Sequence, residues 1–524
     1  MRPHLLLGSF AFTFAFAFAT HRAEARRDRT VAGDVIKAAR LLQSARLDEA
    51  KTVLDDLEKR AADNPDVKWL AGELAFQTGD YAGAVKDLDK VPDDAADGMA
   101  GQTKKLAAST LEVTQSFVET RSPKGHFIIR YAPGKDAAIA ELAGDVLDQA
   151  WQQIGEDVGL QPADPIRVEI LGAPADLARM SPLTETEIET TGTIALSKYN
   201  KLMVVSPRAT LFGYPWMDTL AHEYTHLLVS RISHDTVPVW MQEGIARFEQ
   251  TRWRRPPEVV LTSTEQALLT AGLRKGRLIT FDEMHPSMAK LPSQEAAALA
   301  YAEVYTLIGW MQSKVGYKGL RDALAFQRDG KSAKRAVTEA MNLPWPQVEK
   351  EWHAHLKVGD GKARAGRPIK FGKGGADSEN VGIETVSQRA RKHARLGGML
   401  RARGALDAAA VEYEKALAAN NGPPEPFVAG KLARTLVELG RYDRAIELAT
   451  PLAASDDHDA VAAVTLGMAR TAKQAWPEAI TAYEQALRVS PFDPQTRCGL
   501  AEAYAKMKDA RAARERAACD LLKN

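Results

Sequence analysis

The chain has 524 residues, and its 69 basic and 68 acidic residues leave a formal net charge of +1 at pH 7. This balance provides no general attraction for polyanions, so we expect no nucleic-acid partner. The two cysteines are too few for a disulfide-rich scaffold or for a metal site made of thiolates. The length is sufficient for about three domains.

Residues 1–25 have the pattern of a secretory signal peptide. A positively charged start is followed by an apolar run over residues 5–19, and small-residue cleavage patterns end at Ala19 and Ala25. The run is too short for a comfortable membrane span, and no second apolar stretch of about 18 residues follows it. The sequence therefore predicts an exported protein, periplasmic or secreted, with no transmembrane span in the mature chain. An uncleaved membrane anchor is the alternative.

Residues 26–120 contain a short internal repeat. Ala50 and Ala84 occur in similar contexts, 34 residues apart. This period resembles the tetratricopeptide repeat, a helix pair in which a small residue lets the second helix approach the first. Two such repeats are marginal by themselves. We therefore expect them to gain stability from a helix near residues 102–120 and from docking on the domain that follows.

Residues 121–358 are predicted to form an α+β domain. The segments 126–131, 166–171 and 201–205 are rich in β-forming residues and are bounded by Gly, Pro or Asn, which predicts strands. From Asp218 onward the apolar residues recur mainly at helical spacing. A sheet followed by a helical half is therefore expected.

The central motif is His-Glu-x-x-His at residues 222–226. In a helix, His222 and His226 project from one face about a turn apart, so one metal ion can bind both imidazoles. Glu223 then lies beside the metal position, as suits a base that takes a proton from water there. The alternative is a buried helix whose two histidines are hydrogen-bonded within the protein, because it would have the same sequence pattern.

A catalytic zinc site needs a third protein ligand and leaves one position open. Glu243 is the natural candidate, because it follows His226 by 17 residues with Pro238 between them, so that a second helix can return toward the metal. A neighbouring class of zinc proteases would require Gly in place of Val229 and His in place of Ile232. The sequence therefore predicts one Zn²⁺ ion held by the two motif histidines and Glu243.

Segment 192–250 resembles the gluzincin clan of zinc metallopeptidases, and specifically the bacterial peptidase-MA-like proteins. In those proteins a Pro-x-Trp-x-x-Glu-Gly-x-Ala helix follows the His-Glu-x-x-His helix, and here it reads Pro238, Trp240, Glu243, Gly244 and Ala246. The resemblance covers roughly 120–358. It implies a gluzincin-like fold, peptide or protein substrates, and an extended peptide bound along an edge strand near 192–196.

Two further expectations come from this resemblance. Thermolysin-like relatives carry an Asp four residues after the glutamate ligand, whereas this chain has Arg247, so Asp218 is a possible substitute in supporting the metal ligands. Relatives also place a Tyr or His near the developing oxyanion, which makes Tyr301 and Tyr305 candidates. The alternative is that both tyrosines pack in the core with their hydroxyls satisfied.

Residues 359–385 are rich in Gly and basic residues and are predicted to form a flexible linker. After it, Ala409, Ala445, Ala479 and Ala513 follow one another at intervals of 36, 34 and 34 residues. This spacing resembles four tetratricopeptide repeats over 386–524, which we expect to fold as a separate module and to bind a protein partner on their concave face. A purely structural spacer is the alternative.

Two points remain open from the sequence. Cys498 and Cys519 could form one bridge between neighbouring helices or remain buried thiols.

For function, the sequence favours an exported zinc-dependent peptidase with repeat modules for substrate or partner binding. The competing hypothesis is an extracytoplasmic tetratricopeptide scaffold with a non-catalytic peptidase-like domain, although a pure scaffold has no physical need for Glu223.

Overall fold

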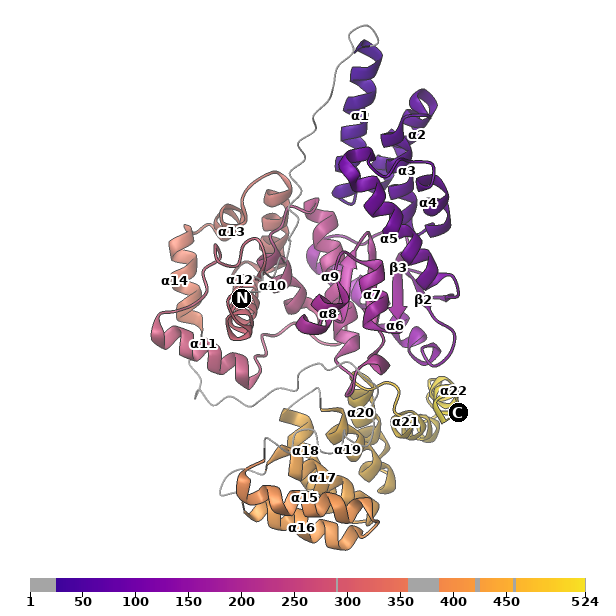
Figure 1. Cartoon of the computed structure of the whole chain (residues 1–524). Helices are drawn as coiled ribbons and strands as arrows, with labels where there is room; N and C mark the ends of the chain where they lie inside the picture. The colour runs from indigo at the N-terminus through magenta and orange to yellow at the C-terminus, as the bar shows by residue number, and fades with distance from the viewer. Residues whose placement is uncertain (1–24, 289–290, 357–385, 420–424, 456–458, 524) are drawn as a thin grey trace, which may run out of the picture.

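The computed structural model of the chain describes residues 25–288, 291–356, 386–419, 425–455 and 459–523. The predicted signal peptide, apart from Ala25, and the predicted linker 359–385 lie outside these residues. An N-terminal helical part, a central part with a sheet and a C-terminal helical part follow one another (Figure 1). None of the helices in the described ranges is long and apolar enough to cross a membrane.

The central part contains a five-stranded mixed sheet with the order β1-β2-β3-β5-β4. Its strands are β1 (Val118–Arg121), β2 (Phe127–Tyr131), β3 (Ile166–Leu171), β4 (Ala195–Lys198) and β5 (Lys201–Val205). The three inner strands are parallel and match the predicted segments, while β1 and β4 pair antiparallel at the two edges. Periodicity did not reveal the two edge strands, because each has only four residues and β1 is largely exposed.

Helices cover both faces of the sheet. The long helices α6 (Ala137–Val158) and α9 (Trp216–Ser233) pack on one face, and α7 (Pro174–Met180) and α8 (Glu185–Thr191) pack on the other. Strand β5 is buried on both faces: Leu202 and Val204 join the core with α6 and α9, and Met203 and Val205 join the core with α7 and α8. The alternation follows from the two-residue period of a strand.

The second half of the central part is helical, as predicted. Its helices are α10 (Val239–Glu249), α11 (Ser263–Lys275), α12 (Gln294–Arg328), α13 (Ala333–Met341) and α14 (Trp345–His355). They enclose a separate core around Trp240, Trp310 and Trp352. Helix α12 is interrupted at Gly316, whose φ of 63° and ψ of −173° are not helical. Glycine reaches this conformation without the steric cost of a side chain.

Helix α12 also buries a carboxyl group, Glu303, which is 0% exposed. Its Oε1 accepts a hydrogen bond from the Ile279 N–H at 2.9 Å, and its Oε2 has no partner among the described residues. Burial raises the pKa of Glu303 from 4.5 to about 8. The folded protein thus holds this proton more tightly than the unfolded chain does. The contribution of the protonated Glu303 to the free energy of unfolding is therefore complete below about pH 4.5 and is lost as the pH rises to about 8.

We therefore expect Glu303→Gln to remove part of the pH dependence of stability. Between pH 5 and pH 8 the free energy of unfolding of the wild type should fall relative to that of the variant, by an amount on the order of 3 kcal/mol. Urea unfolding of both proteins at the two pH values measures this difference. An identical pH dependence in the two proteins would show that Glu303 is not held protonated by the fold.

The N-terminal part consists of two helix pairs and a fifth helix. They are α1 (Ala25–Gln43), α2 (Leu47–Ala61), α3 (Pro65–Thr78), α4 (Tyr81–Leu88) and α5 (Met99–Thr114). Ala50 and Ala84 are fully buried in the second helix of each pair, as the repeat predicts. The pairs also dock on the sheet as expected, because the Tyr81 hydroxyl donates to Glu169 of β3 at 2.7 Å and accepts from Lys201 of β5 at 3.1 Å.

The C-terminal part consists of four helix pairs. The helices are α15 (Gln388–Ala402), α16 (Leu406–Ala418), α17 (Pro426–Glu438), α18 (Tyr442–Ser455), α19 (Ala460–Ala472), α20 (Trp476–Leu487), α21 (Pro494–Lys506) and α22 (Ala512–Lys523). Ala409, Ala445 and Ala479 are fully buried, whereas Ala513 is exposed, so the last pair departs from the repeat pattern. Cys498 and Cys519 form a disulfide that joins α21 to α22.

The expectation that these repeats form a separate module is wrong. Tyr483, Leu487, Leu500 and Tyr504 of the last two repeats belong to the same core as α6, α9 and the sheet. The Arg514 guanidinium of α22 also forms an ion pair with Asp145 of α6. Linker composition indicates only that a segment is flexible, and it does not show whether the domain beyond it returns to the preceding one.

Candidate metal centre

Helix α9 carries the two histidines. Its residues Leu220, Tyr224 and Leu228 recur every four positions and are fully buried against the sheet and α6. His222 and His226 lie on another face and are partly exposed. The helix ends at Ser233, and the next residue, His234, adopts the left-handed conformation with φ of 54°. The periodicity therefore orients both imidazoles away from the core.

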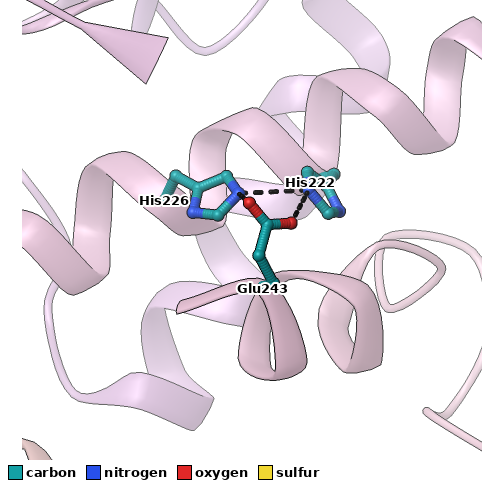
Figure 2. Close-up of side chains that lie close together, drawn as sticks. All are labelled: His222, His226 and Glu243. Atoms are coloured by element: carbon teal, nitrogen blue, oxygen red, sulfur yellow. Dashed lines mark hydrogen bonds and ion pairs between the residues drawn. The ribbon is translucent and has the colours of Figure 1, made fainter. Parts of the chain in front are cut away.

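Helix α10 supplies the third side chain. It begins after Pro238 and buries Trp240, Met241 and Ile245 in the second core. Gly244 allows α10 to approach α12 closely, because a Cβ at this position would lie 2.9 Å from the Val304 carbonyl oxygen. Glu243, next to this glycine, faces α9 and points toward its two histidines (Figure 2).

The donor atoms of these three side chains form a compact cluster (Figure 2). The two Nε2 atoms of His222 and His226 are 3.1 Å apart, and they lie 3.6 and 3.7 Å from the nearest oxygens of Glu243. A tetrahedral zinc ion with bonds of about 2.0–2.2 Å would hold its ligand atoms roughly 3.3–3.6 Å apart. Two imidazoles and one carboxylate are also a donor set that zinc prefers. The cluster therefore fits one such ion.

Glu223 is the buried acid beside this cluster, at 8% exposure. Burial raises the pKa of Glu223 to about 7, and the nearby Glu243 carboxylate acts in the same direction. His226 and a hydrogen bond from the backbone of Ser197 oppose this increase. Ser197 lies in the edge strand β4, so the acid is held between the sheet edge and the donor cluster. Sequence patterns gave no signal for the role of Ser197, because the contact is made by its backbone.

Glu243 behaves differently from Glu223. Burial opposes its ionisation, but the two histidines and Arg247 outweigh this effect and lower the pKa of Glu243. The two acids of the site thus differ, one being held charged and the other poised near neutral pH. Such a separation is typical of sites in which one carboxylate binds and the other exchanges protons.

Arg247 occupies the position at which relatives carry an Asp. Its guanidinium pairs with Glu265 of α11 at 2.5 Å and lies over the Tyr305 ring, 4.8 Å from the centroid. It therefore braces α10 against α11 and α12, and adds a positive charge near Glu243.

Asp218 does not support a histidine, contrary to the possibility raised by the sequence. Its carboxylate accepts hydrogen bonds from Trp253 at 2.8 Å and from the guanidinium of Arg254 at 3.0 and 2.8 Å. Trp253 and Arg254 follow the end of α10. Asp218 thus ties the chain after α10 to α9 and so links the two helices that carry the donor cluster.

The structure separates the roles of the two tyrosines. The Tyr305 hydroxyl donates to the Glu258 carbonyl at 2.7 Å and accepts from the Val260 N–H at 3.0 Å, so it is a satisfied core group. The Tyr301 hydroxyl makes no hydrogen bond to any of the described residues. The Glu243 carboxylate, followed by burial, raises the pKa of Tyr301. Tyr301 therefore is the one of the two whose hydroxyl is available beside the site.

A family model of the peptidase MA superfamily matches residues 146–358. Models of tetratricopeptide repeats match residues 37–99 and residues 467–508. The comparison with curated proteins found no match. The predicted resemblance is therefore confirmed at the level of the family models.

Solved structures similar to this chain include repeat proteins. MamA of AMB-1 is 24% identical, over 27% of this chain and 84% of MamA, with a TM-score of 0.23. A thermophilic tetratricopeptide-repeat protein of Thermus thermophilus is 26% identical, over 25% of this chain and 72% of its own, with a TM-score of 0.23. These TM-scores are too low to support an argument. From the family models, residues 146–358 form a peptidase MA superfamily domain, and tetratricopeptide repeats flank it on both sides.

Proposed function

We propose that the protein is a zinc-dependent peptidase. The observation that supports this best is the convergence of His222, His226 and Glu243 beside a buried Glu223 whose pKa is raised to about 7. A metal site with a purely structural role would be expected to have four protein ligands, whereas three leave a position open. A scaffold without catalysis would have no use for the buried acid beside them.

The side chains suggest how hydrolysis would proceed. A bound zinc ion would act as a Lewis acid that polarises the peptide carbonyl and makes water more acidic. Glu223 would take the proton of the attacking water and deliver it to the departing amine, for which a pKa near the working pH is suitable. Tyr301 would donate a hydrogen bond to the developing oxyanion. An extended peptide would pair with the free edge of β4, close to Glu223.

The setting of this activity is also part of the proposal. The pattern of residues 1–25 supports export to the periplasm or beyond the cell. The tetratricopeptide repeats are helix pairs of a kind that binds proteins, so they support a protein partner or protein substrate.

The test is metal analysis of the purified protein combined with proteolysis of an unstructured peptide. We expect about one zinc ion per chain, activity that chelation removes and added zinc restores, and loss of the ion in His226→Ala. The control His355→Ala changes an exposed histidine at the end of α14 and should retain the ion. Full metal content in His226→Ala would mean that the ligands are wrongly assigned.

A further inference from the structure

We infer that the C-terminal repeats position the helix that carries the two histidines, through the loop 488–493 between α20 and α21. The repeats would then be part of the frame of the catalytic site, as well as a surface for partners. This inference rests on the proposed peptidase function.

The contact lies directly before the histidine helix. The Tyr214 N–H donates to the Val489 carbonyl at 3.1 Å, and the indole N–H of Trp216 donates to the Leu487 carbonyl at 3.0 Å. Trp216 is the first residue of α9 and is 1% exposed. The end of α20 and the loop after it therefore hold the start of α9, six residues before His222.

Gly213 shows how close this contact is. Its φ is +72°, and a Cβ built at this position would lie 2.1 Å from the Val489 carbonyl oxygen and 2.9 Å from the carbonyl carbon. The neighbouring atoms belong to the backbone, so they cannot be moved by rotating a side chain. A side chain at Gly213 would therefore displace the repeats from the segment that leads into α9.

Tyr214 connects this contact to the candidate site. Its backbone is held by Val489, and its hydroxyl donates to the Val205 carbonyl at the end of β5. Burial raises the pKa of Tyr214 well above its ordinary value, and the nearby Glu223 carboxylate raises it further. A displacement of the loop 488–493 would therefore move Tyr214 and so change the surroundings of the proposed base, Glu223.

The loop is itself firmly held, because Arg497 of α21 anchors it to the peptidase domain. This fully buried guanidinium donates to the carbonyl of Pro491 in the loop and to the carbonyl of Ala138 in α6, both at 2.8 Å. Its charge is paired with the equally buried Glu515 of α22 at 2.7 Å. A buried, paired arginine that joins three segments leaves the loop little freedom to follow a displaced α9.

The test compares two glycine substitutions in the full-length protein. Gly213→Ala adds a methyl group against the Val489 carbonyl, whereas Gly125→Ala adds one at φ of +81° with no atom within 4 Å. Both variants place an alanine in the left-handed conformation, at a similar cost in stability. The difference between them is therefore the contact of the new methyl group with the repeats. We expect kcat of Gly213→Ala to be about tenfold to a hundredfold below that of Gly125→Ala, with KM within about twofold, because small misplacements affect the reacting geometry.

Zinc affinity provides a readout that does not require turnover. Competition with a chromophoric chelator should show zinc held several-fold more weakly by Gly213→Ala than by Gly125→Ala, because the two histidines shift relative to Glu243. Trp216→Phe, which removes the hydrogen bond to Leu487, should change kcat and zinc affinity in the same direction to a smaller extent. It also serves as the test if Gly213→Ala does not fold.

The outcomes separate the two hypotheses. The positioning role would be overturned if Gly213→Ala and Gly125→Ala had equal kcat and equal zinc affinity. If Gly213→Ala does not fold, it would be overturned by a Trp216→Phe protein whose kcat and zinc affinity equal those of the wild type. A wild type that binds no zinc and cleaves no peptide would instead overturn the proposed function. A wild type that binds zinc without cleaving leaves the positioning role to be decided by zinc affinity.

Discussion

Replacing Glu223 by glutamine is expected to leave the fold and the bound zinc intact and to lower kcat by on the order of a hundredfold or more. The amide has nearly the same size, and its oxygen can still accept the hydrogen bond from the Ser197 backbone. It cannot accept a proton from water. Because Glu223 is not one of the three clustered donors, the metal content should stay near one ion per chain.

Steady-state cleavage of an unstructured peptide and metal analysis of the same preparation measure this result. Glu303→Gln is the matched control, since it also replaces a buried glutamate of the peptidase domain by glutamine and should retain activity. Turnover of Glu223→Gln at the wild-type rate would show that another group accepts the proton. Loss of zinc together with activity would place Glu223 among the ligands.

Removal of residues 386–524 is expected to abolish zinc binding and cleavage, because the remaining chain should not keep its fold. The four largest buried side chains that the repeats contribute to the shared core are Tyr483, Leu487, Leu500 and Tyr504. At roughly 1.5–3 kcal/mol for each buried apolar side chain, the four contribute at most about 6–12 kcal/mol, and part of this lies within the repeats, where Tyr483 packs on Gly467 and Gly499. This range is comparable with the whole stability of a typical domain, about 5–15 kcal/mol.

Thermal unfolding, size-exclusion chromatography and metal analysis of the shortened chain test this expectation. A chain that lacks only residues 386–455 is the control, because it keeps α19 to α22 and with them these four side chains of the shared core. It should still bind zinc. A monomeric, zinc-binding and active chain ending at residue 357 would show that the peptidase domain does not depend on the repeats.

The parts of the site that the sequence predicts are those set by local spacing. His222 and His226 lie on one helix, and Glu243 lies on the next, so helical periodicity and a short connection are sufficient to bring them together. The tetratricopeptide pairs follow for the same reason, since buried Ala50 and Ala84 report contacts within one helix pair. The three inner strands are long and apolar enough to be recognised.

The remaining features depend on contacts between distant segments. Arg497 and Glu515 have the composition of a solvated helix face, yet each is fully buried, because they pair with each other and Arg497 also reaches the α6 backbone. Trp216 donates to a carbonyl 271 residues away, which no periodicity can indicate. The different roles of Tyr301 and Tyr305, one turn apart on α12, depend on the backbone near Glu258, to which Tyr305 donates.

The hydrogen bond from Trp216 to Leu487 has a consequence for the timing of synthesis. Its two partners are 271 residues apart, so a ribosome that adds about 5–20 residues per second needs roughly 14–54 s between making them. During that interval the peptidase domain lacks part of its core and the support for the start of α9. If the protein is the proposed peptidase, its active site would be completed only after most of the repeats have been made, and the growing chain would be inactive until then.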